Sequence, residues 1–157
     1  MMGTEIERKF LVRGTAWRID GKGIRYCQGY LCLGAEKTVR VRTCGGRGFL
    51  TVKGPGSSLA LREYEYEIPL RDAREMLESL CEKPLIIKDR YKIGHEGLIW
   101  EIDQFHGENS GLIIAEIELE REDQDIPLPD WIDREVSGDP RYFNASLVRN
   151  PWNTWNE

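Results

Sequence analysis

Histidine is scarce in this chain, which limits the chemistry that the chain can perform. The two histidines, His95 and His106, lie in or beside predicted turns, so we expect surface loop residues and not a histidine-based catalytic or zinc site. The stretch "GPGSS" at 54–58 lacks the Lys-Ser/Thr pair that a phosphate-binding P-loop requires, and we interpret it as a loop.

Cysteine motifs and long apolar runs are also missing. The four cysteines form no CxxC pair and no zinc spacing, which indicates reduced thiols that serve mostly in packing. No apolar run approaches the length of a membrane span, and no signal-peptide core follows the opening "MMGTE". These absences predict a cytoplasmic protein without a membrane partner. The cysteines are Cys27, Cys32, Cys44 and Cys81.

The chain also lacks net positive charge. Its formal net charge is −5 and its pI is about 5.2, which argues against nucleic acid as a partner because the phosphate backbone binds to a positive field. A local cluster of Lys and Arg can still attract a small anion. A length of 157 residues with 40% hydrophobic residues predicts one globular domain over 1–157.

Short alternating segments separated by glycine-rich turns make up most of the chain. The turns include "GG" at 45–46, "GHEG" at 94–97 and "GENSG" at 107–111. The predicted strands are 4–12, 24–33, 37–43, 48–53, 61–68, 86–93, 98–105 and 112–121. So many hairpin-connected strands predict an antiparallel barrel or sandwich.

Three segments are predicted to be helical. Residues 69–80 have apolar side chains at helical spacing, and weaker helices are predicted around 141–147 and 15–19. The predicted fold class is therefore mainly β (α+β), an eight-stranded antiparallel barrel with a few flanking helices.

The polar faces of the predicted strands are the informative ones. The opening "TEIERKFLV" places Glu5, Glu7 and Lys9 on one face of a strand, with Ile6 and Phe10 on the other. Later strands are nearly single-signed: basic in "VRVR", "LTVK" and "IIKDRY", acidic in "EYEYEI", "WEID" and "AEIELE". Neighbouring like charges repel unless cations stand opposite. The pattern therefore favours faces that turn inward around a ligand, over a sandwich with charged outer faces.

The residue types on these faces suit a polyanion with metal ions. Arg and Lys side chains match the oxygens of a triphosphate chain, while carboxylates beside such an anion imply a hard cation, Mg²⁺ or Mn²⁺. Such metals clamp phosphates and activate water. The six cations are Lys9, Arg40, Arg42, Lys53, Lys88 and Arg90.

Taken in order, these motifs resemble the CYTH domain family, or triphosphate tunnel metalloenzymes. "EIERKFLV" is similar to the ExExK opening of that family, and "VRVR", "LTVKG", "EYEYEI", "KDRY", "WEIDQF", "AEIELE" and "YFNASL" follow in its order over about residues 3–148. The resemblance implies an eight-stranded antiparallel tunnel that binds inorganic or nucleoside triphosphate with Mg²⁺ or Mn²⁺. Within the family the chain resembles bacterial tripolyphosphatases, which implies metal-dependent hydrolysis of the terminal phosphate of tripolyphosphate.

The resemblance also implies roles for particular side chains. The implied metal ligands are Glu5, Glu7, Glu116, Glu118 and Glu120. The implied catalytic and phosphate-binding residues are the six cations above, and Glu63, Glu65 and Asp103 are implied lumen acids that orient those bases or hold water at the substrate.

Several alternatives stay open at this point. The family also contains adenylate cyclases and thiamine triphosphatases, and a non-catalytic polyphosphate- or nucleotide-binding module would share the cations. Tyr142 and Asn144 match the late family motif either as a structural plug or as ligand contacts, and Trp152 and Trp155 are expected to cover one end of the fold. The number of metal ions, a general base and the oligomeric state, with a homodimer as one alternative, are left open.

Overall fold

The computed structural model describes residues 3–18, 22–55 and 61–155; for residues 3–5 and 61 the description is limited to the backbone. The strands are β1 (Gly3–Glu5), β2 (Glu7–Val12), β3 (Ile24–Leu33), β4 (Thr38–Cys44), β5 (Arg47–Pro55), β6 (Leu61–Ile68), β7 (Ile86–His95), β8 (Leu98–Phe105), β9 (Ile113–Glu118) and β10 (Ile132–Glu135). The helices are α1 (Leu70–Ser79) and α2 (Asn144–Arg149), with short 3₁₀ turns η1 (Gly107–Asn109), η2 (Pro140–Tyr142) and η3 (Trp152–Thr154). In the described ranges, no helix has the length and apolar character needed to cross a membrane.

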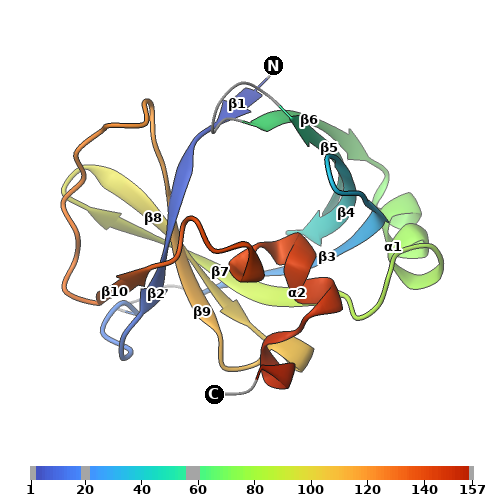
Figure 1. The fold of residues 1–157 in the computed structure, drawn as a ribbon. Helices are drawn as coiled ribbons and strands as arrows, with labels where there is room; N and C mark the ends of the chain where they lie inside the picture. Colours follow the sequence, from blue (N-terminus) through green and yellow to red (C-terminus); the bar gives the residue numbers. More distant parts are fainter. Residues whose placement is uncertain (1–2, 19–21, 56–60, 156–157) are drawn as a thin grey trace.

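The strands form one antiparallel sheet whose two ends are joined by the N-terminal strand. The order is β1-β6-β5-β4-β3-β7-β8-β9-β2-β10. Only Ile6 separates β1 from β2, so residues 3–12 pair with β6 on one side and with β9 on the other. Figure 1 shows the strands curled around a central opening. With β1 and β2 counted as one strand and β10 as an added edge, the eight-stranded antiparallel prediction is confirmed.

Two tight hairpin turns follow the glycine pattern of the sequence. Between β4 and β5, Gly45 and Gly46 both have positive φ, 57° and 79°, which suits a two-residue turn between twisted strands. Between β7 and β8, Glu96 and Gly97 do the same, with φ of 53° and 81°. These turns set the register that places alternate side chains on the inner face.

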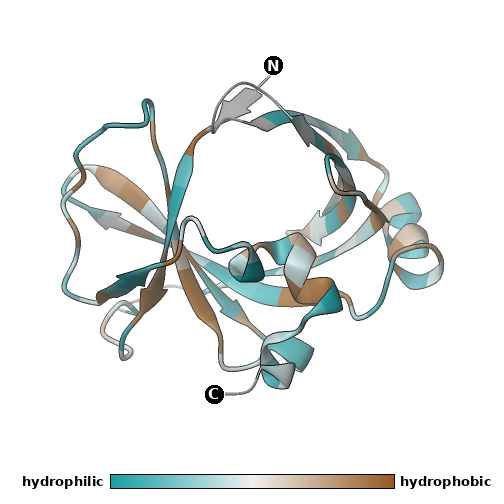
Figure 2. Cartoon of the chain, viewed as in Figure 1, coloured by the Kyte–Doolittle hydropathy of each residue, from teal (hydrophilic) through white to brown (hydrophobic). Residues whose placement is uncertain are grey.

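Three apolar clusters surround and plug this ring. The first lies on the strand faces that carry Phe10, Trp100 and Ile102, and Trp17 and Trp131 cover it. Another lies under α1, where Ala73 and Leu77 pack on Val41. Figure 2 shows the resulting bands of hydrophobic and hydrophilic residues along the strands.

The third cluster lies on the same strand faces as the charged residues, further along the strands. It joins Phe105 and Ile114 to Leu147 and Val148 of α2. Because alternate residues of a strand share a face, Ile114 lies on the face of Glu116. One part of the lumen is therefore packed with apolar side chains, and the charged residues occupy the remainder.

Some sequence predictions about local structure were wrong. The predicted helix over 15–19 is a turn in its described part, where Trp17 is buried and its indole N–H donates to the Gly14 carbonyl. The predicted helix around 141–147 is confirmed in part: residues 144–147 lie in α2, but Phe143 separates α2 from the 3₁₀ turn η2. The strand β10 was not predicted, because "IDRE" contains one apolar residue and no alternation.

Candidate active site

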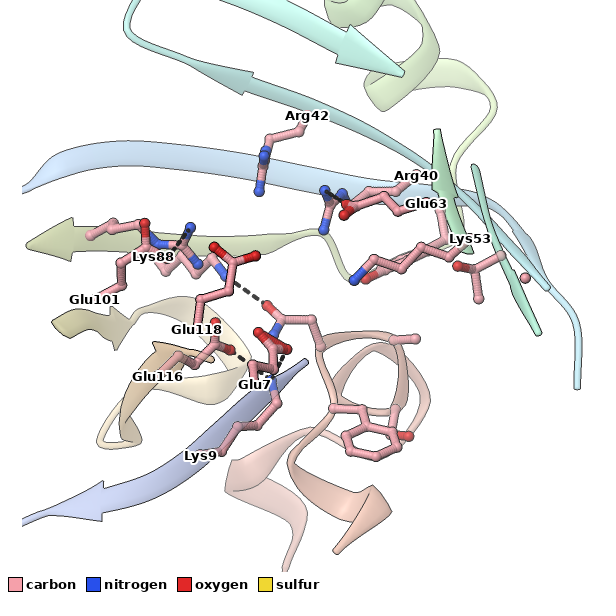
Figure 3. A pocket seen from close by; sticks show the side chains of 18 of the residues that line it. Glu7, Lys9, Arg40, Arg42, Lys53, Glu63, Lys88, Glu101, Glu116 and Glu118 are labelled. Carbon is pink, nitrogen blue, oxygen red and sulfur yellow. Dashed lines mark hydrogen bonds and ion pairs between the residues drawn. The ribbon is translucent and has the colours of Figure 1, made fainter. Parts of the chain in front are cut away.

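The lumen contains a cavity of about 910 Å³ that is lined mainly by charged side chains. Its lining confirms that the polar strand faces turn inward. Figure 3 shows acidic side chains of β2 and β9 across from cationic side chains of β4 and β5. Of the residues predicted for the site, the cavity is lined by Glu7, Lys9, Arg40, Arg42, Lys53, Glu63, Lys88, Arg90, Glu116 and Glu118.

One side of the cavity, which we call the acidic wall, consists of Glu7, Glu116 and Glu118 with Lys9 among them. The antiparallel register of β2 and β9 places Glu7 opposite Glu118 and Lys9 opposite Glu116. Lys9 Nζ lies 2.6 Å from Glu116 Oε2 and 3.9 Å from Glu7 Oε1. The opening motif and the late acidic strand therefore form one surface.

Protonation within the acidic wall is set by these contacts. Burial opposes the charge on Lys9, but the Glu116 and Glu7 carboxylates outweigh it and raise the pKa of Lys9 above its ordinary value. Burial likewise favours neutral Glu116, yet Lys9 and Arg90 hold the pKa of Glu116 well below its ordinary value. Both side chains are therefore ionised at neutral pH. Glu116 accepts a hydrogen bond from Lys9, and Glu7, at 3.9 Å from Lys9, is paired in register with Glu118.

The other side, which we call the cationic wall, consists of Arg40 and Arg42 from β4 and Lys53 from β5. The contacts of the two arginines are loose: Arg40 lies 3.9 Å from the Glu63 and Glu65 carboxylates, and Arg42 lies 3.3 Å from Glu65. Burial and the neighbouring guanidinium groups of Arg40 and Arg90 lower the pKa of Arg42. Cations of like sign gathered on one wall produce a positive field that favours an anion in the cavity.

A tightly held charge network on β7 and β8 supports both walls. Asp103 is 1% exposed, and its two oxygens accept hydrogen bonds from Arg90 at 2.7 and 2.8 Å, with Lys88 Nζ at 2.8 Å. The pKa of Asp103 stays below its ordinary value: burial would raise it, but Lys88 and Arg90 outweigh that effect. Burial and Arg90 lower the pKa of Lys88 to about 8, although Asp103 and Glu116 oppose the change. Asp103 thus fixes the positions of two cations that line the cavity.

The remaining predicted site residues lie elsewhere. Glu65 is exposed and contacts Arg42 and Thr51 instead of lining the cavity. Glu120 is exposed beyond the end of β9, where its N–H donates to Gln124, and it is not part of the cavity lining. Glu5 lies in β1, and its side chain is outside the described residues.

The histidines are placed as expected from the sequence. His106 contacts Asp89 outside the cavity lining, and His95 is in the last position of β7 beside the turn. Among the side chains that the structure describes, no three His, Cys, Asp or Glu residues form a ready-made metal cluster. The paired carboxylates Glu7 and Glu118 remain the oxygen donors that suit a hard cation.

Two further charged or polar residues of the cavity lining, Glu101 and Asn144, were not among the predicted site residues, although the sequence left Asn144 open as a structural plug or a ligand contact. Glu101 lines the cavity and lies 3.2 Å from Arg90, although its alternation with Asp103 in "WEID" had placed it on the same face. Asn144, at the first position of α2, also lines the cavity and accepts a hydrogen bond from Lys88 at 2.9 Å. No pattern in the sequence signals that contact, because it joins segments 56 residues apart.

These features define a class of protein: an antiparallel β-strand tunnel whose lumen carries a cationic wall facing an acidic wall. The chain belongs to the CYTH domain family, which matches residues 3–150. The resemblance found in the sequence motifs is therefore confirmed.

Relatives match over nearly the whole chain. An inorganic triphosphatase of Acetivibrio thermocellus is 54% identical over 156 residues, covering 99% of this chain and 100% of the relative. An inorganic triphosphatase of Nitrosomonas europaea is 38% identical over 152 residues, covering 92% and 97%. A crystal structure of an inorganic triphosphatase superposes with a TM-score of 0.68 at 35% identity, covering 94% of this chain and 95% of that chain.

Proposed function

We propose that this chain hydrolyses the terminal phosphoanhydride bond of inorganic tripolyphosphate, with nucleoside triphosphates as further substrates. The observation that carries the proposal is the presence of a cationic and an acidic wall in one cavity. A module that only binds anions would need the cations but not the facing carboxylates. The relatives described above, which are named inorganic triphosphatases, support the same substrate class.

The cations are proposed to bind and orient the phosphates. Arg40, Arg42 and Lys53 reach the cavity from one side, and Arg90 and Lys88 reach it from β7. Arg forks two phosphate oxygens, whereas Lys acts as a point charge. The bonds to Asp103 hold Arg90 and Lys88 in place before substrate arrives, so little reorganisation is needed when charge develops on the phosphoryl oxygens.

The acidic wall is proposed to hold Mg²⁺ or Mn²⁺. Glu7 and Glu118 face each other on adjacent strands and present carboxylate oxygens, the donors that these cations prefer, and Glu5 and Glu116 are the further candidates. When bound, such a metal neutralises phosphate charge and activates a water. Lys9 keeps Glu116 ionised and occupied by an ammonium group, so this carboxylate also orients Lys9 toward the phosphates.

A substrate panel tests the proposal. Phosphate release is measured from tripolyphosphate, ATP, thiamine triphosphate and pyrophosphate, each with Mg²⁺, with Mn²⁺ and with EDTA. We expect tripolyphosphate with a divalent cation to be hydrolysed fastest and hydrolysis to stop in EDTA. Binding of tripolyphosphate without phosphate release in either metal would instead identify a non-catalytic module.

We further propose that the partner is this small-molecule substrate, not nucleic acid or a membrane, and that the protein acts in the cytoplasm. The acidic net charge supports the first point, and the six cations proposed to bind phosphate line the cavity.

A further inference from the structure

The carboxamide of Asn144 is held from two sides at the edge of the cavity. Its Oδ1 atom accepts a hydrogen bond from Lys88 Nζ at 2.9 Å and another from Gln28 Nε2 at 3.2 Å. Asn144 is the first residue of α2, and Leu147 and Val148 anchor this helix in the apolar part of the lumen. The carboxamide is therefore fixed relative to Lys88 of β7 and to the strand β3.

This arrangement decides which end of the carboxamide faces the cavity. An ammonium group has only donors, so Asn144 must present its oxygen to Lys88. A carbonyl oxygen accepts two hydrogen bonds, and both are accounted for by Lys88 and Gln28. None of the hydrogen bonds among the described residues uses the Asn144 Nδ2 amino group, and Asn144 lines the cavity. Two N–H donors are thus available beside Lys88.

Gln28 holds the Asn144 carboxamide in this orientation, and the Gln28 carbonyl oxygen is left without a hydrogen-bond partner among the described residues. Its side chain is fully buried, at 0% exposure. Because Nε2 donates to Asn144, Oε1 is left buried without a partner among the described residues. Buried carbonyl groups are rarely left unsatisfied, so the Gln28 amide is arranged in favour of Asn144.

We propose that Asn144 is a substrate-binding residue whose Nδ2 group donates hydrogen bonds to phosphate oxygens, and that Gln28 is the positioning residue that holds it. The inference rests on the proposed function and extends it to the C-terminal segment. The recognised group is a phosphoryl oxygen of a triphosphate, because the donors lie next to the Lys88 ammonium group in a cavity lined by cations.

Asn144→Asp tests the donor role. Asp keeps the shape and an oxygen for Lys88 and Gln28 but replaces the amino group with an acceptor that repels phosphate. The matched control is Ser146→Asp, which adds the same charge to the cavity lining two residues away on α2. The dissociation constant of sodium tripolyphosphate is measured by calorimetry in EDTA, and the KM is measured with Mg²⁺.

We expect Asn144→Asp to weaken tripolyphosphate binding and raise KM by roughly 10- to 100-fold, the loss typical of a hydrogen bond to a charged group. The loss in Ser146→Asp should be several-fold smaller. Equal losses in the two variants would show that added charge is sufficient and would overturn the inference, as would binding by Asn144→Asp within about threefold of wild type.

A double-mutant cycle tests the positioning role and does not depend on Asn144→Asp folding. Gln28→Leu should raise KM with little change in kcat in the wild-type background and should have no further effect on KM in an Asn144→Ala background. An equal KM effect in both backgrounds would refute positioning through Asn144. If wild type binds tripolyphosphate in EDTA but releases no phosphate with metal, the proposed function fails, and the binding measurements still decide the role of Asn144.

Discussion

Replacing Asp103 with Asn tests the buried charge network directly. The Asp103 side chain holds Lys88 and Arg90 at 2.7–2.8 Å, so the substitution leaves two buried cations without their shared counter-ion. Removing one partner of a buried ion pair costs about 3–5 kcal/mol. We expect about 3 kcal/mol here, because Arg90 keeps its contact with Glu101 and Lys88 can release its proton. For a domain of this size, Tm should fall by roughly 6–12 °C.

Differential scanning fluorimetry at pH 7 in EDTA measures this shift. The control, Glu67→Gln, breaks an exposed ion pair with Arg47 and should move Tm by about 2 °C or less. Since the pKa of Asp103 is depressed, its contribution is fully present above its ordinary pKa of 3.8 and is lost as the pH falls through the depressed value. The gap between wild type and variant should therefore narrow in acid. Equal Tm shifts for Asp103→Asn and Glu67→Gln at pH 7 would refute the reasoning.

Three further outcomes follow from the site. Glu7→Gln and Glu118→Gln should each abolish metal-dependent tripolyphosphate hydrolysis, and their effects on the rate should be non-additive in the double variant. The control Glu120→Gln should keep a near-wild-type rate. Rate losses that multiply in the double variant would exclude a metal ion shared by Glu7 and Glu118. Arg40→Ala should slow turnover by roughly 10²-fold, and an unchanged kcat/KM would remove Arg40 from the site. Because the pKa of Lys88 is lowered to about 8, Lys88 loses its charge as the pH rises above that value. Tripolyphosphate binding in EDTA should therefore weaken between pH 7 and 9 in the wild type relative to a Lys88→Arg variant. Parallel pH profiles of binding for the two proteins would contradict this.

Much of the fold and of the cavity lining was predictable because strands alternate their side chains. The pattern "VRVR" is enough to place Arg40 and Arg42 on one face, and the single sign of each face indicates that it turns inward. The alternation does not predict which side chains of an inward face are buried and which reach the cavity. Asp103 and Glu101 alternate on one strand, yet Asp103 is sealed under Lys88 while Glu101 reaches the cavity.

The other gaps have physical causes of the same kind. Glu120 continues the alternation of "AEIELE", but β9 ends at Glu118. The alternating pattern therefore extends two residues beyond the strand itself. Asn144 and Gln28 meet across 116 residues, a contact that depends on how α2 docks and that no local pattern contains.

The position of Ile6 between β1 and β2 has a consequence for the order of folding. Residues 3–12 close the ring by pairing with two strands remote in sequence, and the Lys9–Glu116 pair joins residues 107 apart. The hairpins from β3 to β6 and from β7 to β9 need only neighbouring segments. Because non-local pairing carries a large loop-closure cost, we expect residues 3–12 to be among the last to dock onto the sheet. Before β9 is in place, the charged face of β2 is solvated and lacks the strand that pairs with it in the folded protein.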